Sequence, residues 1–141
     1  MEIKNRKAFF NYFIEDKIES GLVLTGTEIK SIRKGSANIK DSYVRIKGSE
    51  AFVINMFIAK YDNGSVFNHD EYRERKLLLH KSEIKKLKDY CQIDGFTLVP
   101  LEVYLKKNKA KLLIGICKGK KLYDKRESIK QRDLDRERRL K

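Results

Sequence analysis

The sequence predicts a mainly β protein, in which a closed antiparallel barrel carries two or three peripheral helices and is followed by a basic C-terminal tail. Two observations predict this fold. Five or six segments have apolar residues at every second position, which is the period of a half-buried strand, and short polar turns join them. Only two segments show a clear helix pattern, and 141 residues leave room for a single core, so an antiparallel sheet fits better than a parallel one.

The first predicted strand leads directly into the first predicted helix. The strand is expected to be bent, because apolar residues at alternate positions give way to a second apolar run. These positions are Phe10, Tyr12 and Ile14, followed by residues 21–24. Thr25 and Glu28 then have the spacing of a capping box, which predicts a helix that begins here and ends at Gly35.

Two hairpins and a second helix complete the predicted domain. The hairpins turn at residues 48–49 and at residues 107–109, and their arms are residues 43–47 with 51–58 and residues 97–105 with 112–116. Pro100 lies inside an arm and indicates an edge strand or a bulge, because proline has no amide hydrogen to donate. Between the hairpins, Ser82 is expected to begin a helix that Gly95 ends.

These elements favour a Greek-key barrel that partly resembles the oligonucleotide-binding fold. Residues 1–117 are expected to form this domain and residues 118–141 a separate tail. No apolar run reaches the length of a membrane span and no signal-peptide pattern is present, so a cytoplasmic protein is expected. Cys91 and Cys117 have no metal-binding spacing and are expected to be buried as small apolar side chains.

The tail carries about half of the formal net charge of +13, with 11 Lys or Arg residues against 5 Asp or Glu residues. Asp124 and Glu127 have capping-box spacing, so a helix is predicted to begin there. At 100° per residue, its basic side chains then form one stripe within an arc of about 60°. The stripe consists of Lys125, Arg132, Arg136 and Arg139. We expect the tail to be disordered when free and helical on a polyanion, with a merely solubilising tail as the alternative.

The residue patterns of common enzymes are absent from the sequence. The glycines do not form a phosphate-binding loop, and His69 and His80 each lack a partner at metal-binding spacing, which predicts surface or structural histidines. The acidic residues Glu15, Asp16 and Glu19 could hold a nuclease metal, although a charged strand end is the commoner explanation. The sequence therefore predicts a protein that is not an enzyme and that uses neither a metal nor a cofactor.

A nucleic-acid-binding protein explains the charge distribution better. Basic clusters recur at residues 4–7, 30–34, 73–76 and 118–121, and a barrel could bring several of them onto one face to contact phosphates. A uniformly basic, solvated surface is the alternative. The aromatic residues near the first strand either stack on bases or fill the core; they are Phe9, Phe10, Tyr12 and Phe13.

Several blocks of sequence, spread from Asn5 to the tail, have the residues and the order of one known family. The blocks are NRKA at 5–8, ESG at 19–21, GTEIKSIR at 26–33, NIKD at 38–41, RKLLLHK at 75–81, Gly115, GKK at 119–121 and DKR at 124–126. In these blocks the chain resembles the SsrA-binding protein family, also called small protein B.

The resemblance implies a bacterial, non-catalytic protein that holds the tRNA-like domain of transfer-messenger RNA and delivers it to stalled ribosomes for trans-translation. It also implies a closed Greek-key barrel, and a tail that enters the decoding region and message channel of the small subunit as a helix. Elongation factor Tu and alanyl-tRNA synthetase are implied as indirect partners. From the residues alone, a general single-stranded RNA- or DNA-binding protein stays open as the alternative.

The resemblance further implies which residues bind. On the barrel, the RNA-binding positions are Asn5, Glu19, Arg33, Lys76, Leu78 and Lys81. In the tail, the ribosome-binding positions are Gly119, Lys120, Lys121, Tyr123, Asp124, Lys125 and Arg126, to which the basic stripe adds Arg132, Arg136 and Arg139. Physically, Glu19 could accept hydrogen bonds from sugar hydroxyls and Leu78 could pack on an unstacked base. The alternatives are a strand-end charge and a core leucine, and Glu28 is expected to act mainly as the capping partner of Thr25.

Overall fold

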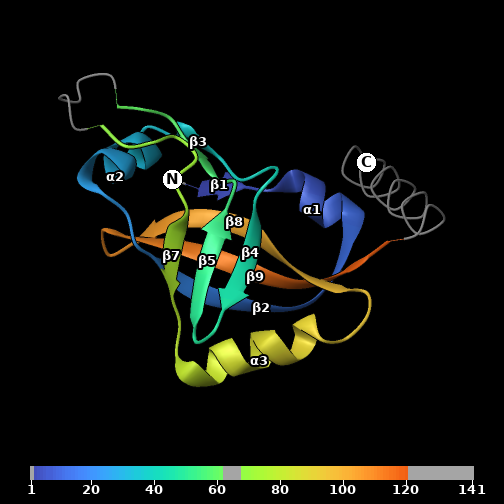
Figure 1. Cartoon of the computed structure of the whole chain (residues 1–141). Helices are drawn as coiled ribbons and strands as arrows, with labels where there is room; N and C mark the ends of the chain where they lie inside the picture. Colours follow the sequence, from blue (N-terminus) through green and yellow to red (C-terminus); the bar gives the residue numbers. More distant parts are fainter. Residues whose placement is uncertain (1, 62–67, 121–141) are drawn as a thin grey trace, which may run out of the picture.

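The structure is a computed structural model that describes residues 2–61 and 68–120 (Figure 1). Within those residues the chain is mainly β, with helices at three places around the sheet. The elements are β1 (Glu2–Lys4), α1 (Arg6–Asn11), β2 (Tyr12–Leu22), α2 (Gly26–Arg33), β3 (Ala37–Asn38), β4 (Tyr43–Lys47), β5 (Glu50–Ile54), β6 (Phe57–Ile58), β7 (Arg75–Leu78), α3 (Lys81–Cys91), β8 (Phe96–Lys106) and β9 (Lys109–Gly119). The mainly β prediction is confirmed.

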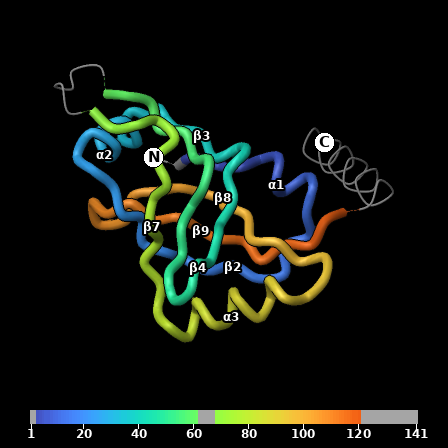
Figure 2. Tube along the Cα trace, in the orientation of Figure 1, coloured from blue at the N-terminus to red at the C-terminus, as the bar shows by residue number. Residues whose placement is uncertain are grey.

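Seven of the strands form one curled sheet in the order β1-β8-β9-β2-β7-β5-β4, and every neighbouring pair is antiparallel. Figure 2 shows β7 and β4 crossing in front of β8, β9 and β2. The predicted closed barrel is not found, because no strand pairing joins the two ends of this sheet in the part of the chain that the structure describes. β4 lies near β8 without pairing with it, and residues 2–4 pair with residues 102–104 of β8.

Two bulges bend the long strands and decide which face each side chain occupies. The register shifts between Pro100 and Glu102 in β8 and between Ile14 and Asp16 in β2. The bulge at Pro100 agrees with the prediction from its missing amide hydrogen. A bulge reverses the alternation of side chains along a strand, so β8 presents Leu101 to one face and Val103 to the other.

The two faces of the sheet carry two separate apolar clusters. The larger cluster fills the concave side and includes Ile32 of α2 and Leu87 of α3. The smaller cluster lies on the outer face, where Ala8 of α1 packs with Leu101 and Cys117. The three helices therefore cover different parts of the sheet, and within residues 2–61 and 68–120 it is α1 that packs on the outer face of β2 and β8 (Figure 1).

Helix α1 is where the sequence prediction of a strand was wrong. Phe10 belongs to this helix, and β2 begins only at Tyr12. Asn5 caps the helix, since its Oδ1 accepts a hydrogen bond from the Ala8 amide at 3.2 Å. Over so few residues the aromatic spacing fits either period, and the contact of Ala8 with the outer cluster decides in favour of the helix.

The remaining elements follow the prediction with local differences. The capping box of α2 is present, with Glu28 Oε1 accepting from the Thr25 amide at 2.8 Å. The apolar run 51–58 is split into β5 and β6, because the chain turns at Asn55, whose φ is 60°. Cys117 is buried as predicted, but Cys91 is exposed at the end of α3, where the helix has passed the edge of the core.

The described residues can be compared with the sequence predictions about membrane spans, metal sites and histidines. Within 2–61 and 68–120, no helix combines the length and the apolar content needed to cross a membrane. Nor do these ranges bring three or more His, Cys, Asp or Glu side chains together at a distance suitable for a metal ion. His69 is buried in a structural role, with Nδ1 2.9 Å from Thr27 Oγ1 and Nε2 2.9 Å from Ile58 O, whereas His80 is exposed at the start of α3.

Candidate nucleic-acid interface

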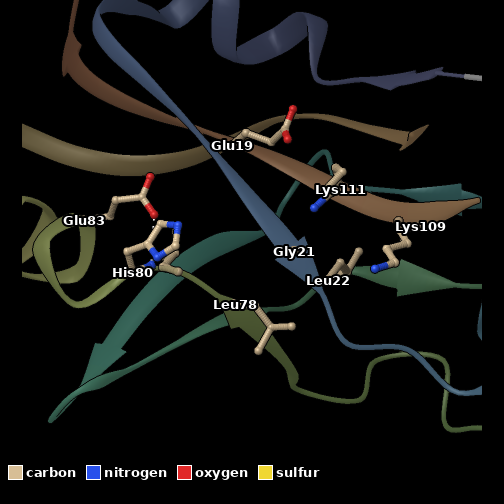
Figure 3. A pocket seen from close by; sticks show the side chains of 10 residues that line it. Glu19, Gly21, Leu22, Leu78, His80, Glu83, Lys109 and Lys111 are labelled. Carbon is tan, nitrogen blue, oxygen red and sulfur yellow. Dashed lines mark hydrogen bonds between the residues drawn. The ribbon is translucent and has the colours of Figure 1, made fainter. Parts of the chain in front are cut away.

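A groove of about 550 Å³ crosses the outer face of the sheet between β9, β2, β7 and the start of α3 (Figure 3). Strand pairing brings together residues that are far apart in the sequence. The groove is lined by Glu19, Gly21, Leu22, Leu78, Leu79, His80, Glu83, Lys109, Ala110 and Lys111. Figure 3 shows Lys109 and Lys111 on one side of β2 and His80 with Glu83 on the other. The two ammonium groups therefore lie across the groove from an imidazole and a carboxylate, and apolar residues lie between them.

The floor of the groove depends on a single register row. Lys111 of β9, Gly21 of β2 and Leu78 of β7 lie opposite one another in successive strands. A Cβ atom at Gly21 would lie 3.2 Å from Leu78 Cβ, which is closer than most real contacts of this kind. The absence of a side chain at Gly21 therefore lets Leu78 lie close over β2, and Leu78 is nevertheless 56% exposed. An exposed leucine at this point is available to an apolar partner, and it is not the core residue that its leucine-rich context also allowed.

Glu19 lies on the same face of β2 and is held by neighbours from β8. The Tyr104 hydroxyl donates a hydrogen bond to the Glu19 carboxylate, and Lys106 Nζ lies 3.6 Å from Glu19 Oε1. The hydrogen bond from Tyr104 lowers the pKa of Glu19, and burial together with this bond raises the pKa of Tyr104 to about 12. Glu19 is thus a charged acceptor at neutral pH, exposed and fixed in place.

Lys111 is a groove residue that the sequence prediction missed. It follows a turn and precedes an apolar arm, so it resembles an ordinary strand-end charge in the sequence. The signal that identifies it is the hairpin register, since the turn at residues 107–108 places Lys111 on the outer face opposite Gly21. Two cations of β9 therefore border the groove that holds Glu19 and Leu78.

The other predicted barrel residues lie at different distances from this groove in the fold. Lys76 is exposed two residues before Leu78 on the same strand face, with its Nζ 3.8 Å from Glu50 Oε1. Lys81 is exposed at the first position of α3, directly after the groove residue His80. Arg33 is exposed at the end of α2 and does not line the groove.

Asn5 is buried, with only 4% of its surface exposed. Its Nδ2 donates to Pro100 O at 2.9 Å and to Ile39 O at 3.4 Å, while its Oδ1 caps α1. The two Nδ2 contacts join the start of α1 to distant parts of the fold, and the Oδ1 contact stabilises α1 itself. The contacts of Asn5 are therefore structural, and a direct contact with RNA stays a prediction.

The prediction that the basic residues at 73–76 contact phosphates is wrong for Arg75. Arg75 is fully buried, with Nε 2.6 Å from Glu28 Oε2, and Arg73 Nη2 lies 2.6 Å from Glu28 Oε1. Arg75 also donates to the carbonyl oxygens of residues 56, 70 and 71. Glu28 is therefore more than a capping partner, and Arg75 is not available to phosphates.

The structure describes only the first two residues of the predicted ribosome-binding set. Gly119 ends β9 opposite Tyr12, and the Lys120 amide donates to Asn11 O at 2.9 Å. The sheet thus continues two residues past the predicted boundary at residue 117. The other predicted tail positions lie outside the described residues; they are Lys121, Tyr123, Asp124, Lys125, Arg126, Arg132, Arg136 and Arg139.

The chain is similar to one family of proteins along nearly its whole length. The family model described as SmpB protein matches residues 2–141. The SsrA-binding protein of Acetivibrio thermocellus is 58% identical over 140 residues, which cover 98% of this chain and 91% of the relative. The SsrA-binding protein of Enterococcus faecalis is 55% identical over 134 residues, which cover 95% of this chain and 87% of the relative. A solved structure described as "tmRNA-SmpB: a journey to the center of the bacterial ribosome" is 41% identical with a TM-score of 0.73, covering 86% of this chain and 85% of its own.

Proposed function

The chain belongs to the SmpB protein family, and we propose that it binds transfer-messenger RNA and carries it to stalled ribosomes in trans-translation. It is an RNA-binding protein and not an enzyme. The observation that carries the proposal within the fold is the row Lys111–Gly21–Leu78 with Glu19 beside it. This groove offers an apolar surface, a charged acceptor and cations within one binding site.

Each of these groups matches a different part of a folded RNA loop. Leu78 is suited to pack against an unstacked base, and Glu19 is suited to accept hydrogen bonds from ribose hydroxyls or base amino groups. Lys109 and Lys111 are suited to contact phosphates, which fix the position of the RNA without reading its sequence. We therefore assign the groove to the tRNA-like domain of the RNA, in which loops present unstacked bases.

The tail is assigned to the ribosome in this proposal. Its basic stripe is expected to become helical in the decoding region and message channel of the small subunit. The RNA bound in the groove would then occupy the position of a tRNA body, and elongation factor Tu and alanyl-tRNA synthetase would act on that RNA without direct contact with the groove. The proposed location of these events is the cytoplasm.

A competition experiment tests the assignment of the groove. At one fixed salt concentration, the full chain is expected to bind the tRNA-like domain much more tightly than unstructured RNA of equal length, because electrostatic attraction alone would not distinguish them. Leu78→Ala is expected to weaken binding to the tRNA-like domain by about tenfold, as for loss of the apolar surface that one leucine side chain buries against a base. Ile93→Ala, which truncates a similarly exposed aliphatic residue away from the groove, is expected to change it less than about twofold.

The rival is a general single-stranded nucleic-acid binder, and the same experiment can favour it. Equal affinities for unstructured RNA and for the tRNA-like domain would contradict the proposal. Equal effects of Leu78→Ala and Ile93→Ala would move the interface away from the groove while leaving the family function in place.

A further inference from the structure

A second pocket lies on the outer face of the sheet, next to the groove. It has a volume of about 530 Å³ and is formed by Lys4 of β1, Arg6 and Phe9 of α1, Lys17 of β2 and Glu102 of β8. Four elements that are distant in the sequence therefore converge on it. Three of the five lining residues are cationic and one is aromatic.

The aromatic residue in this pocket is exposed. Phe9 has 41% of its surface accessible, whereas its neighbour Ala8 is buried in the outer apolar cluster. Lys17 Nζ lies 6.0 Å from the centre of the Phe9 ring, at the outer limit of a cation–π contact. Part of the Phe9 side chain is therefore accessible to a partner, whereas Ala8 is not.

Two of the cations that line this pocket are not held in ion pairs within residues 2–61 and 68–120. Elsewhere in the described residues, Lys47, Lys76, Lys86 and Lys106 each form an ion pair with a carboxylate. Among the described residues, Arg6 and Lys17 form none, although Glu102 borders the same pocket. Unpaired cations next to an exposed ring can neutralise phosphates without first breaking a protein ion pair.

The pocket lies on the same face of the sheet as the groove, and one row of paired residues connects the two sites. Glu19 of β2, Leu113 of β9, Glu102 of β8 and Lys4 of β1 form one row across the sheet. Glu19 lines the groove, and Glu102 and Lys4 line the pocket. Lys17 lies on the same face of β2 as Glu19, two residues away, which is about 7 Å along a strand.

We propose that this pocket holds an unstacked base of the RNA bound in the groove, with Phe9 stacking on the base and Arg6 and Lys17 contacting the flanking phosphates. The inference rests on the proposed function, because it takes the occupant to be the tRNA-like domain. It extends the interface beyond the predicted binding residues and gives a role to the exposed Phe9 side chain beside Arg6 and Lys17. Stacking accepts any base, so the pocket contributes affinity and orientation more than sequence selectivity.

Substitutions at Phe9 in the full chain test the stacking contact. Phe9→Ala is expected to weaken binding to the tRNA-like domain by about tenfold, which corresponds to one base–aromatic stack. Phe9→Tyr keeps a ring and is expected to bind within about twofold of the unmodified chain. The matched control is Phe13→Ala, since Phe13 is 49% exposed, has Lys120 Nζ 5.1 Å from its ring centre and does not line the pocket. It is expected to have less than a twofold effect.

A charge substitution provides a second measurement that does not depend on the ring. Lys17→Gln is expected to reduce the slope of log K against log salt by about 0.7, as for loss of one single-strand phosphate contact. The proposal would be overturned if Lys17→Gln left the salt slope unchanged and Phe9→Ala left the affinity unchanged. So would a loss confined to binding of vacant ribosomes without the RNA, because ribosomal RNA would then be the occupant.

Leu78→Ala is measured alongside to separate the two claims. If Leu78→Ala weakens binding and Phe9→Ala does not, the pocket is overturned and the groove stands. If neither substitution matters and the tRNA-like domain binds no better than unstructured RNA, the proposed function fails and the pocket fails with it.

Discussion

Deleting residues 121–141 is expected to abolish tagging of nascent chains on stalled ribosomes while changing affinity for the tRNA-like domain by less than about threefold. The reason is that the groove is built entirely from residues 19–111, whereas the tail carries a large share of the positive charge. The deletion begins after Lys120 because its amide still donates to Asn11 O and completes the end of the sheet. Tagging in a reconstituted translation system and RNA affinity are measured on the same preparation.

A matched pair of point variants tests whether the tail acts as a helix. Ile129→Pro lies inside the predicted helix and removes an amide donor there, so it is expected to reduce tagging nearly as much as the deletion. Ile129→Ala keeps the helix and is expected to retain most of the activity. Parallel loss of RNA binding and tagging on deletion would contradict the division of labour, and equal activity of the two Ile129 variants would contradict the helix.

Glu28→Gln is expected to lower the free energy of unfolding by about 3–5 kcal/mol, because it leaves the buried guanidinium of Arg75 without its counter-charge. Glu28 and Arg75 are both inaccessible to solvent. The comparison is Glu74→Gln, which breaks the exposed pair between Glu74 and Lys47 and is expected to cost less than about 1 kcal/mol. Urea unfolding followed by circular dichroism measures both variants.

Glu28 also determines how the free energy of unfolding depends on pH in the acid range. Burial alone would raise the pKa of Glu28, but hydrogen bonds from Arg73, the Thr25 amide and Arg75 outweigh burial and lower the pKa from 4.5 to about 2. A depressed pKa in the folded state contributes stability above the unfolded pKa, and this contribution is lost as the pH falls from about 4.5 towards 2. At 1.36 kcal/mol per pKa unit the loss is about 3 kcal/mol. Glu28→Gln should remove most of this dependence, and an equally steep acid transition in Glu28→Gln and Glu74→Gln would contradict the assignment.

The sequence was sufficient for elements whose signals are local. The Thr25–Glu28 capping box, the turn at residues 107–108 and the bulge at Pro100 each depend on a few neighbouring residues, and each is present in the structure. The helix at residues 6–11 could not be predicted in this way. It depends on Asn5, whose side chain binds carbonyl oxygens 34 and 95 residues away, and on the contact of Ala8 with the outer cluster.

The candidate site was predicted only in part, because it too depends on contacts between residues that are far apart in the sequence. Glu19 and Leu78 were named through the resemblance as RNA-binding residues, which stays a prediction, and the structure places both in one groove. Lys111 was not identified, because its place beside the groove depends on strand register that local sequence does not specify. For Phe9 the sequence left base stacking and core packing open, because the choice depends on helix orientation. Arg75 was assigned to a phosphate-binding cluster because a basic residue between basic residues resembles a surface site, and its partner Glu28 is 47 residues away.

The most direct test of the central claim, that the groove holds the tRNA-like domain, is hydroxyl-radical cleavage from an iron chelate attached to the protein. The chelate is placed at Lys109→Cys, on the rim of the groove, or at Asp94→Cys, an exposed position past the far end of α3. Both carry Cys91→Ser, and Cys117 stays buried. On stalled ribosomes, the Lys109→Cys chelate is predicted to cleave the tRNA-like domain and the Asp94→Cys chelate is not. Cleavage of that domain from residue 94 but not from residue 109 would contradict the claim.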